Sequence, residues 1–243
     1  GVRGVFGTSH RDVMIGGGGF DDFFGGRGDD LLTGGSSHGG EGNDRLIGRS
    51  VGGGSVALWG DEGNDWIFGT DGPGRTDIYL IGGKGNDHIF AGAGDDTYVT
   101  GDEGNDFIDG GAGNDFIDGG VGKDILLSGS GNDTINPDVE FFQRTPDQAR
   151  DGAKDVIKVT RADLGAYTDV VLSRSFEAGC DEVRFKDAIR GGHDYRLFTE
   201  AQSFNDAGRL WRPDDLADRA NTVLQIDQDG DGFGGTTPDK DDY

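Results

Sequence analysis

The chain has 243 residues, of which 46 are acidic and 22 are basic, so its formal net charge is -24. Nucleic acids and anionic membrane surfaces both require basic patches, and this charge balance argues against either as a partner. A single cysteine, Cys180, excludes an internal disulfide framework. The sequence contains no run of about 18 apolar residues, so it predicts no membrane-spanning helix.

A nine-residue repeat fills most of residues 1–136. Ten units share Gly at position 4, Asp at position 6 and an apolar residue at position 8. The units begin at Gly16, Gly25, Gly39, Gly60, Gly82, Ala91, Gly101, Gly110, Gly119 and Ser128. The sixth-position aspartates are Asp21, Asp30, Asp44, Asp65, Asp87, Asp96, Asp106, Asp115, Asp124 and Asp133. The eighth-position residues are Phe23, Leu32, Leu46, Ile67, Ile89, Tyr98, Ile108, Ile117, Leu126 and Ile135. A flexible linker of this composition would not keep an apolar residue at this spacing.

Three degenerate units complete the series. They span residues 7–15, 48–59 and 69–81. The first keeps Asp12, and the last places Asp77 where a repeat aspartate would fall. We expect residues 34–38 to form a loop insertion and Thr100 to be a single inserted residue.

The repeat predicts a flattened spiral of short strands. In a stretch such as Phe107-Ile108-Asp109, the alternation of a strand sends the middle side chain to the face opposite its neighbours, so the eighth positions form one core. The other six residues of a unit must reverse the chain, which glycines permit through positive φ. Two units then make one turn, and every second unit stacks as a parallel strand.

This stacking places the repeat aspartates above one another, about 4.8 Å apart along each edge. Bare carboxylates at this spacing repel, so a solenoid without metal would leave its charges uncompensated. Calcium fits the ligands on offer, because it takes roughly 6–8 oxygens from carboxylates and backbone carbonyls. Zinc requires His or Cys, and magnesium prefers a tighter octahedral site.

These units resemble the repeats-in-toxin (RTX) family of hemolysin-type calcium-binding repeats over residues 7–136. The resemblance implies an all-β fold, a right-handed parallel β-roll (β-solenoid), followed by a β-rich capping region with a short helix. It implies calcium ligation by the sixth-position aspartates and turn carbonyls, with roughly 6–10 ions in all. Asp12 and Asp77 are further candidate ligands, at sites that we expect to be weaker or absent in the degenerate units. It also implies a type I secretion apparatus as partner, and a location that is secreted, extracellular or at the bacterial cell surface.

After Pro137 the glycine repeat stops, so we divide the chain into a β-roll, residues 1–136, and a C-terminal capping domain, residues 137–243. Strands are expected at Val156–Thr160, Asp169–Leu172, Glu182–Phe185, Tyr195–Phe198 and Thr222–Ile226. A helix is expected at Pro213–Ala220, because proline and two aspartates suit a first helical turn. By the resemblance, the segment that starts at Lys154 caps the roll.

The acidic tail contains a second candidate calcium site at Asp227, Asp229 and Asp231. These residues match positions 1, 3 and 5 of an EF-hand loop, and Gly232 matches position 6. The acidic residue of position 12 is missing, because Pro238 stands there. The alternative interpretation is an acidic turn after a strand.

No residue predicts catalysis. Ser37 and Ser50 fit a G-x-S-x-G pattern, which a glycine-rich segment produces by chance. We therefore expect a non-enzymatic calcium-binding module that folds on extracellular calcium and supports the secretion and stability of a larger protein. The alternative is a calcium-stabilised adhesin whose C-terminal part binds a carbohydrate or peptide. Its candidate ligand-stacking aromatics are Trp59, Trp66, Tyr195 and Trp211, and packing is the favoured explanation of them.

Overall fold

The computed structural model describes residues 4–16, 22–49, 54–71, 76–131, 133–137, 153, 155–160, 170–172, 182–186, 195–199 and 222–226. All regular structure in these residues is β-strand. The described part contains no helix long and apolar enough to cross a membrane.

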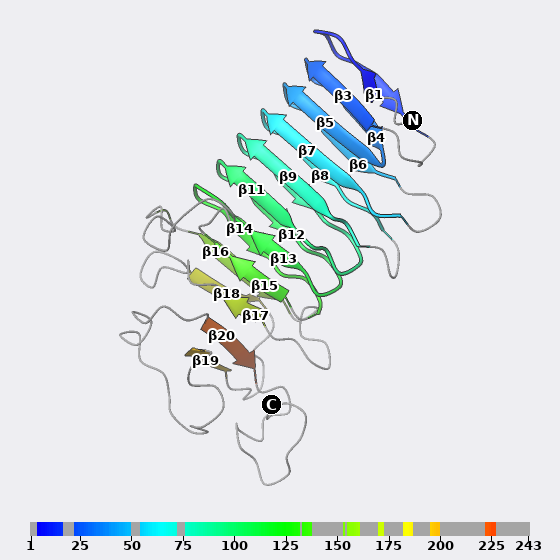
Figure 1. The fold of residues 1–243 in the computed structure, drawn as a ribbon. Helices are drawn as coiled ribbons and strands as arrows, with labels where there is room; N and C mark the ends of the chain where they lie inside the picture. The colour runs from blue at the N-terminus through cyan, green and yellow to red at the C-terminus, as the bar shows by residue number, and fades with distance from the viewer. Residues whose placement is uncertain are drawn as a thin grey trace.

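Two sheets face each other along the molecule (Figure 1). Sheet A contains the odd-numbered strands and sheet B the even-numbered ones, except that β20 also joins sheet A. The sheet A strands are β1 (Gly4–Phe6), β3 (Asp22–Arg27), β5 (Ser36–Glu41), β7 (Ala57–Glu62), β9 (Tyr79–Lys84), β11 (Val99–Glu103), β13 (Phe116–Asp118), β15 (Asp133–Asn136), β17 (Val170–Leu172), β20 (Thr222–Ile226) and β19 (Tyr195–Thr199). The sheet B strands are β2 (Val13–Ile15), β4 (Leu31–Gly34), β6 (Arg45–Gly48), β8 (Trp66–Phe68), β10 (His88–Phe90), β12 (Phe107–Asp109), β14 (Ile125–Leu127), β16 (Val156–Thr160) and β18 (Glu182–Lys186).

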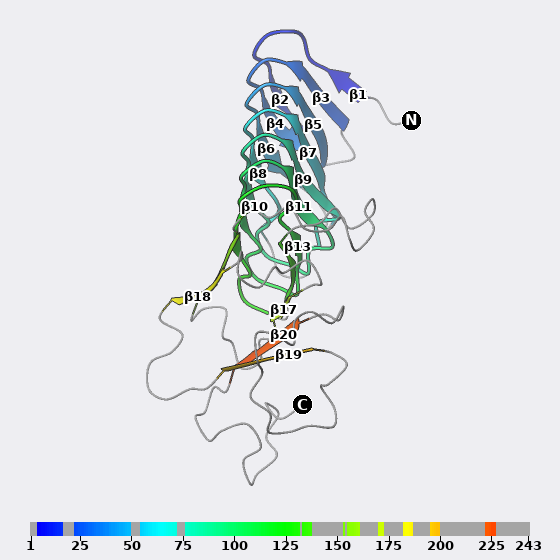
Figure 2. The same ribbon diagram turned by 90° about the vertical axis from the view of Figure 1, so that its left-hand side faces the viewer.

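The chain alternates between the sheets from β1 to β18, and each strand pairs in parallel with the strand two places along the chain. Ile89, for example, pairs with Ile67 on one side and Ile108 on the other. The side view shows the resulting coil, with its turns stacked at two edges (Figure 2). The parallel β-roll expected from the repeat is confirmed.

One inward-facing residue per strand forms the core. Twelve of them have no exposed area: Leu32, Leu46, Leu58, Ile67, Leu80, Ile89, Val99, Ile108, Ile117, Leu126, Ile135 and Ile157. Burial of each such side chain stabilises the fold by roughly 1.5–3 kcal/mol. The eighth-position prediction is confirmed for every regular unit except the one that begins at Ala91, where Val99 replaces Tyr98 in the core. Val99 pairs with Leu80 and Ile117, so the extra residue of this unit precedes Val99, and the assignment of Thr100 as the insertion was wrong.

Residues 34–38 are not a loop insertion. Ser36, Ser37 and His38 belong to β5, and Ser37 pairs with Phe23 and with Leu58. Gly35 alone connects β4 to β5, and Ser37 occupies a core position with no exposed area. A strand at these residues is needed to join β3 to β7 in sheet A. The turn before this strand is therefore shortened to Gly35, and no additional loop is present.

Beyond residue 136, β16, β17 and β18 continue the parallel stacking, while β20 pairs antiparallel with both β17 and β19. The expected strands in this region are confirmed to within a residue or so at their ends. The division into residues 1–136 and 137–243 stays a prediction. Asp21, the helix at Pro213–Ala220 and the tail aspartates Asp227, Asp229 and Asp231 lie outside the described residues.

Candidate calcium sites

The chain passes from sheet A to sheet B at what we call the first edge, through the six residues that end at each repeat aspartate and that we call a turn. After β3, β5, β7, β9 and β11, the first three of these six residues still belong to the sheet A strand. In the turn of residues 82–87, Gly83 and Gly85 have φ of 111° and 129°, a backbone region that favours glycine. Asp61 and Asp102 hold the same second position of their turns with φ of 74° and 70°. Aspartate is among the few residues that adopt this region at modest cost.

Repeat aspartates stack along the first edge as a hydrogen-bonded ladder. The backbone N–H of Asp65 donates to Oδ1 of Asp87 at 2.7 Å, and that of Asp87 donates to Oδ1 of Asp106 at 2.8 Å. The same bond recurs from turn to turn. The members of this first ladder are Asp12, Asp30, Asp44, Asp65, Asp87, Asp106, Asp124 and Asp155.

A second ladder lies at the opposite edge, where sheet B leads back to sheet A. Its members are Asp77, Asp96, Asp115 and Asp133, joined by bonds of 2.8 to 2.9 Å. Every predicted repeat aspartate that the structure describes therefore lies on one ladder or the other. All except Asp12 are buried.

The other carboxylate oxygen, Oδ2, has no hydrogen-bond partner at seven of these aspartates. They are Asp30, Asp44, Asp65, Asp87, Asp96, Asp106 and Asp115. A buried polar group without a partner costs about 1–3 kcal/mol, and a charged group costs more. An array of such oxygens therefore requires either protons or a cation.

Backbone carbonyls gather at the same places. A Cβ added to Gly82 would collide with Oδ2 of Asp87 and would lie 2.7 Å from the carbonyl oxygen of Gly101 in the next turn. Gly60 faces Asp65 and Gly82 in the same way. The first glycine of a turn thus leaves a space lined by oxygens from two successive turns. This donor set is the one that calcium prefers.

Within the described residues, no three His, Cys, Asp or Glu side chains converge on one point. That finding accords with the geometry, because the space at Gly82 is lined by one carboxylate, that of Asp87, together with a backbone carbonyl oxygen.

Burial raises the pKa of the seven carboxyl groups whose Oδ2 has no hydrogen-bond partner. The pKa reaches about 6 at Asp44, about 7 at Asp87, Asp96 and Asp106, and about 8 at Asp65 and Asp115. Desolvation is the largest cause, and neighbouring aspartates raise the pKa further, whereas the bond from the backbone N–H lowers it. In the absence of a cation the ladders therefore hold protons more tightly than exposed aspartates do.

Asp12 and Asp77 differ from the other aspartates. Oδ2 of Asp12 accepts hydrogen bonds from the N–H and the hydroxyl of Thr8, at 2.6 and 2.9 Å. Oδ2 of Asp77 accepts the N–H of Thr70 at 2.7 Å, and Oδ1 accepts its hydroxyl at 2.9 Å. The threonine occupies the second position of each turn.

Two features of the ladders were not predicted from the sequence. Asp155 joins the first ladder, where it has no exposed area and accepts the N–H of Asp124 at 2.7 Å. The only sign of it in the sequence is the apolar residue Ile157 two positions later, because position 4 of this unit is not glycine.

The fifth positions of the turns form a further, exposed ladder outside that of the repeat aspartates. Its hydrogen bonds run toward the N-terminus, as the N–H of Asn86 donates to Oδ1 of Asn64 at 2.7 Å.

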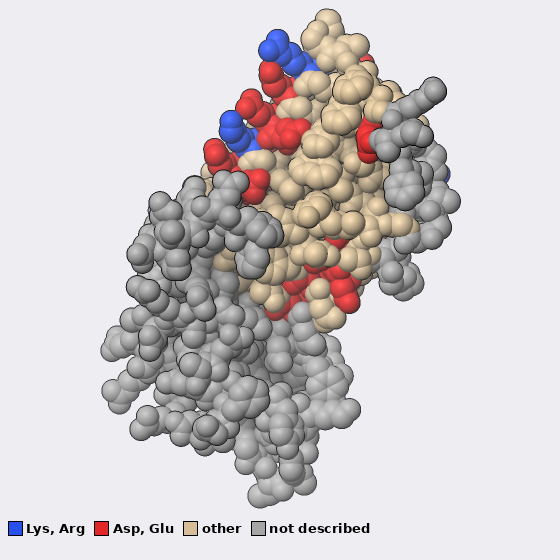
Figure 3. Space-filling view, viewed as in Figure 1, with Lys and Arg blue, Asp and Glu red and all other residues tan. Residues whose placement is uncertain are grey.

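The third positions of the first-edge turns carry a row of exposed charges that lie side by side on sheet A. Arg27 pairs with Glu41 at 3.1 Å, and Lys84 pairs with Glu62 at 3.0 Å. Figure 3 shows these charges along the margin of the face, whereas the middle of sheet A carries few of them. The basic residues compensate part of the acidic surface near the carboxylate ladder.

Aromatic rings stack on the outer faces of both sheets. The Trp59 ring lies 4.3 Å from His38 with an interplanar angle of 1°, and the Trp66 ring lies 4.4 Å from His88 at 5°. Ring faces that are covered in this way support the packing interpretation of Trp59 and Trp66. Trp211 and the Tyr195 side chain lie outside the described residues, and the adhesin alternative stays a prediction.

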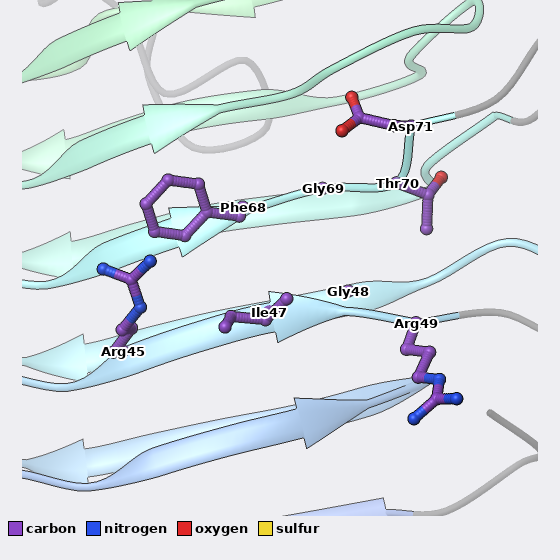
Figure 4. A pocket seen from close by; sticks show the side chains of 8 residues that line it. All are labelled: Arg45, Ile47, Gly48, Arg49, Phe68, Gly69, Thr70 and Asp71. Carbon is purple, nitrogen blue, oxygen red and sulfur yellow. The ribbon is translucent and has the colours of Figure 1, made fainter. Parts of the chain in front are cut away.

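A shallow pocket of about 380 Å³ lies between the ends of β6 and β8. The guanidinium of Arg45 lies 4.4 Å above the Phe68 ring, and Thr70 and Asp71 follow at the end of β8 (Figure 4). None of the ladder aspartates lines this pocket, so it is separate from the oxygen-lined spaces.

Comparison with protein families agrees with this geometry. The family model of the RTX calcium-binding nonapeptide repeat matches the chain in four copies, at residues 6–37, 38–74, 79–103 and 100–135. The chain belongs to this family. RTX repeats bind several calcium ions between them, and they form a structural, calcium-binding module. No curated protein and no solved structure matches the chain.

Proposed function

We propose that this RTX chain folds when calcium binds, with ions held between successive turns by repeat aspartates and turn carbonyls. The set of seven buried Oδ2 atoms without a hydrogen-bond partner carries the proposal. These oxygens meet the carbonyls of the next turn only when the turns are stacked. The free energy of calcium binding therefore contributes directly to folding.

The proposed ligands in the described residues are the seven aspartates with an open Oδ2, together with Asp124 and Asp133 at the C-terminal turns of the ladders. Asp21, Asp227, Asp229 and Asp231 stay predicted ligands on sequence grounds. We expect roughly 6–10 ions, which would offset about half or more of the net charge of -24.

We further propose that the module acts outside the cell. Extracellular calcium modules bind with dissociation constants of about 10⁻⁴–10⁻³ M, so the chain would stay unfolded at the calcium level of the cytosol. An unfolded chain can pass through a type I secretion apparatus and then fold on the far side. In this role it supports the export and stability of a larger protein, and any catalytic activity lies outside these residues.

Far-UV circular dichroism of the EDTA-treated chain tests the folding proposal. We expect a cooperative change from coil to strand signal as calcium rises from the sub-millimolar to the millimolar range, and no change with magnesium. A chain that is fully folded in EDTA and does not respond to calcium would contradict the proposal.

A matched pair of variants separates the sites from general charge effects. Asp87→Asn removes a buried open oxygen, and we expect the calcium midpoint to rise by about tenfold, as a loss of about 1–3 kcal/mol implies. Asp95→Asn removes an exposed charge at position 5, where other turns already carry Asn. Its midpoint should match the parent chain, and equal shifts in both variants would argue against specific sites.

A further inference from the structure

The turns that contain Asp12 and Asp77 have the repeat aspartate but differ in how its charge is compensated. In the other turns that carry a repeat aspartate and that the structure describes, the second position holds Gly, or Asp at positive φ. Here it holds Thr8 or Thr70, neither of which has positive φ. The changed backbone directs the threonine N–H and hydroxyl toward the carboxylate.

The turn at Thr70 is the more informative of the two because it is buried. Thr70 is 3% exposed and Asp77 is 1% exposed. The two donors of Thr70 reach Oδ2 and Oδ1 of Asp77 at 2.7 and 2.9 Å. At Asp65, by contrast, Oδ2 is buried without any partner. The two threonine donors thus bind both oxygens of a buried carboxylate. At seven other buried carboxylates, among them that of Asp65, Oδ2 has no such donor.

Donors and a cation compete for the same place. An N–H or O–H that points at a carboxylate presents the positive end of its dipole there, which repels a divalent ion. The donors also supply the hydrogen bonds that a buried carboxylate needs, so no cation is required to offset its desolvation.

We infer that Thr8 and Thr70 take the place of calcium at these two turns. They close the turns through hydrogen bonds alone, and Asp12 and Asp77 are not calcium ligands. This inference rests on the proposed function, because it states which turns of the roll bind the calcium that the function requires and which do not.

The rest of the second edge agrees with this partition. Gly35 alone joins β4 to β5, and residues 48–56 contain no acidic residue. Among the described residues, Asp77 is the only buried carboxylate on this edge before Asp96. Between β4 and β9 the roll is therefore held by calcium at the first edge only, and from the turn of Asp96 to that of Asp133 at both edges.

Counting bound calcium in the full chain, by equilibrium dialysis or native mass spectrometry, tests the inference. Asp77→Asn and Asp115→Asn change two buried aspartates of the same edge, which are 1% and 2% exposed. We expect Asp77→Asn to bind as many ions as the parent chain and Asp115→Asn to bind at least one fewer. An ion lost from Asp77→Asn would overturn the inference.

Thr70→Gly provides a second readout that does not require Asp77 to be changed. If Thr70 replaces calcium, the variant binds the same number of ions as the parent chain or one more. If the variant binds one fewer, Thr70 is itself a ligand and the inference is wrong. A parent chain that binds no calcium at all would instead overturn the proposed function, so the two failures are distinguishable.

Discussion

The two edges of the roll are built from one repeat but carry different numbers of carboxylates. In the described residues the first ladder has eight aspartates and the second has four. Every first-edge turn from Asp30 to Asp106 has an Oδ2 without a hydrogen-bond partner, whereas on the second edge Thr70 donates to both oxygens of Asp77 and such an Oδ2 is present at Asp96 and Asp115. The core and the strand pairing are therefore the same along both edges, whereas the turns can be stabilised either at a calcium site or by hydrogen bonds from threonine.

The largest expected effect compares Asp65→Asn with Asp106→Asn on the first edge. Asp65 lies where the second edge has no open carboxylate, and Asp106 lies between Asp96 and Asp115. We expect Asp65→Asn to remove the amide-exchange protection of β7 and β8 at calcium levels that saturate the parent chain. In Asp106→Asn the second edge should preserve most of the protection of β11 and β12.

Hydrogen exchange followed by mass spectrometry measures this directly. The control is Asn64→Asp, which adds a charge at an exposed position beside Asp65. Equal loss of protection in the two Asn variants would mean that the edges do not act independently.

A smaller effect is expected from pH in the absence of calcium. A carboxyl group whose pKa is raised by folding stabilises the metal-free fold below its unfolded pKa, near 3.8, and this contribution is lost as pH rises through the folded pKa. The folded pKa is about 6 at Asp44, about 7 at Asp87, and about 8 at Asp65 and Asp115.

In EDTA the strand signal should therefore increase when the pH falls from about 8 to about 5, the range that these pKa values define. In saturating calcium the same acidification should weaken binding, because protons compete with the ion for the carboxylates. A metal-free chain whose circular dichroism does not change between these pH values would contradict the raised pKa values.

The smallest expected effect is a gain in stability from Ser37→Ala. Ser37 occupies a core position in β5 with no exposed area, and its hydroxyl has no hydrogen-bond partner. Removal of a buried hydroxyl without a partner should stabilise the fold by about 1 kcal/mol. Urea unfolding in saturating calcium measures the change, and Ser36→Ala, on the outer side of the same strand, is the control. A destabilised Ser37→Ala would show that the hydroxyl has a partner.

The roll could be predicted from the sequence wherever the geometry of a position allows only one type of residue. Glycine at positive φ, aspartate at the ladder and an apolar residue in the core each leave one signal per unit. The prediction failed at Tyr98 and Val99, because two adjacent apolar residues leave the register open. Pairing of Val99 with Leu80 and Ile117 then decides it.

Other features depend on contacts between distant units and leave no local signal. Ser37 fills a core position because the sheet needs a strand there, although its polarity suggests a loop. Asp155 joins the ladder through a bond to Asp124, thirty-one residues away in sequence. The threonine donors at Asp12 and Asp77 become visible only when their distances are known.

The strict alternation of strands between two sheets has a consequence for how such a chain can change in length. Removal of one nonapeptide would transfer every later strand to the opposite sheet and every later turn to the opposite edge. β15, β17 and β20 would move together and keep their pairing, but later first-edge aspartates would then stack on the earlier second-edge ladder. Removal of two consecutive units would leave every later turn on its own edge. The different carboxylate content of the two edges is therefore preserved only when repeats are gained or lost in pairs.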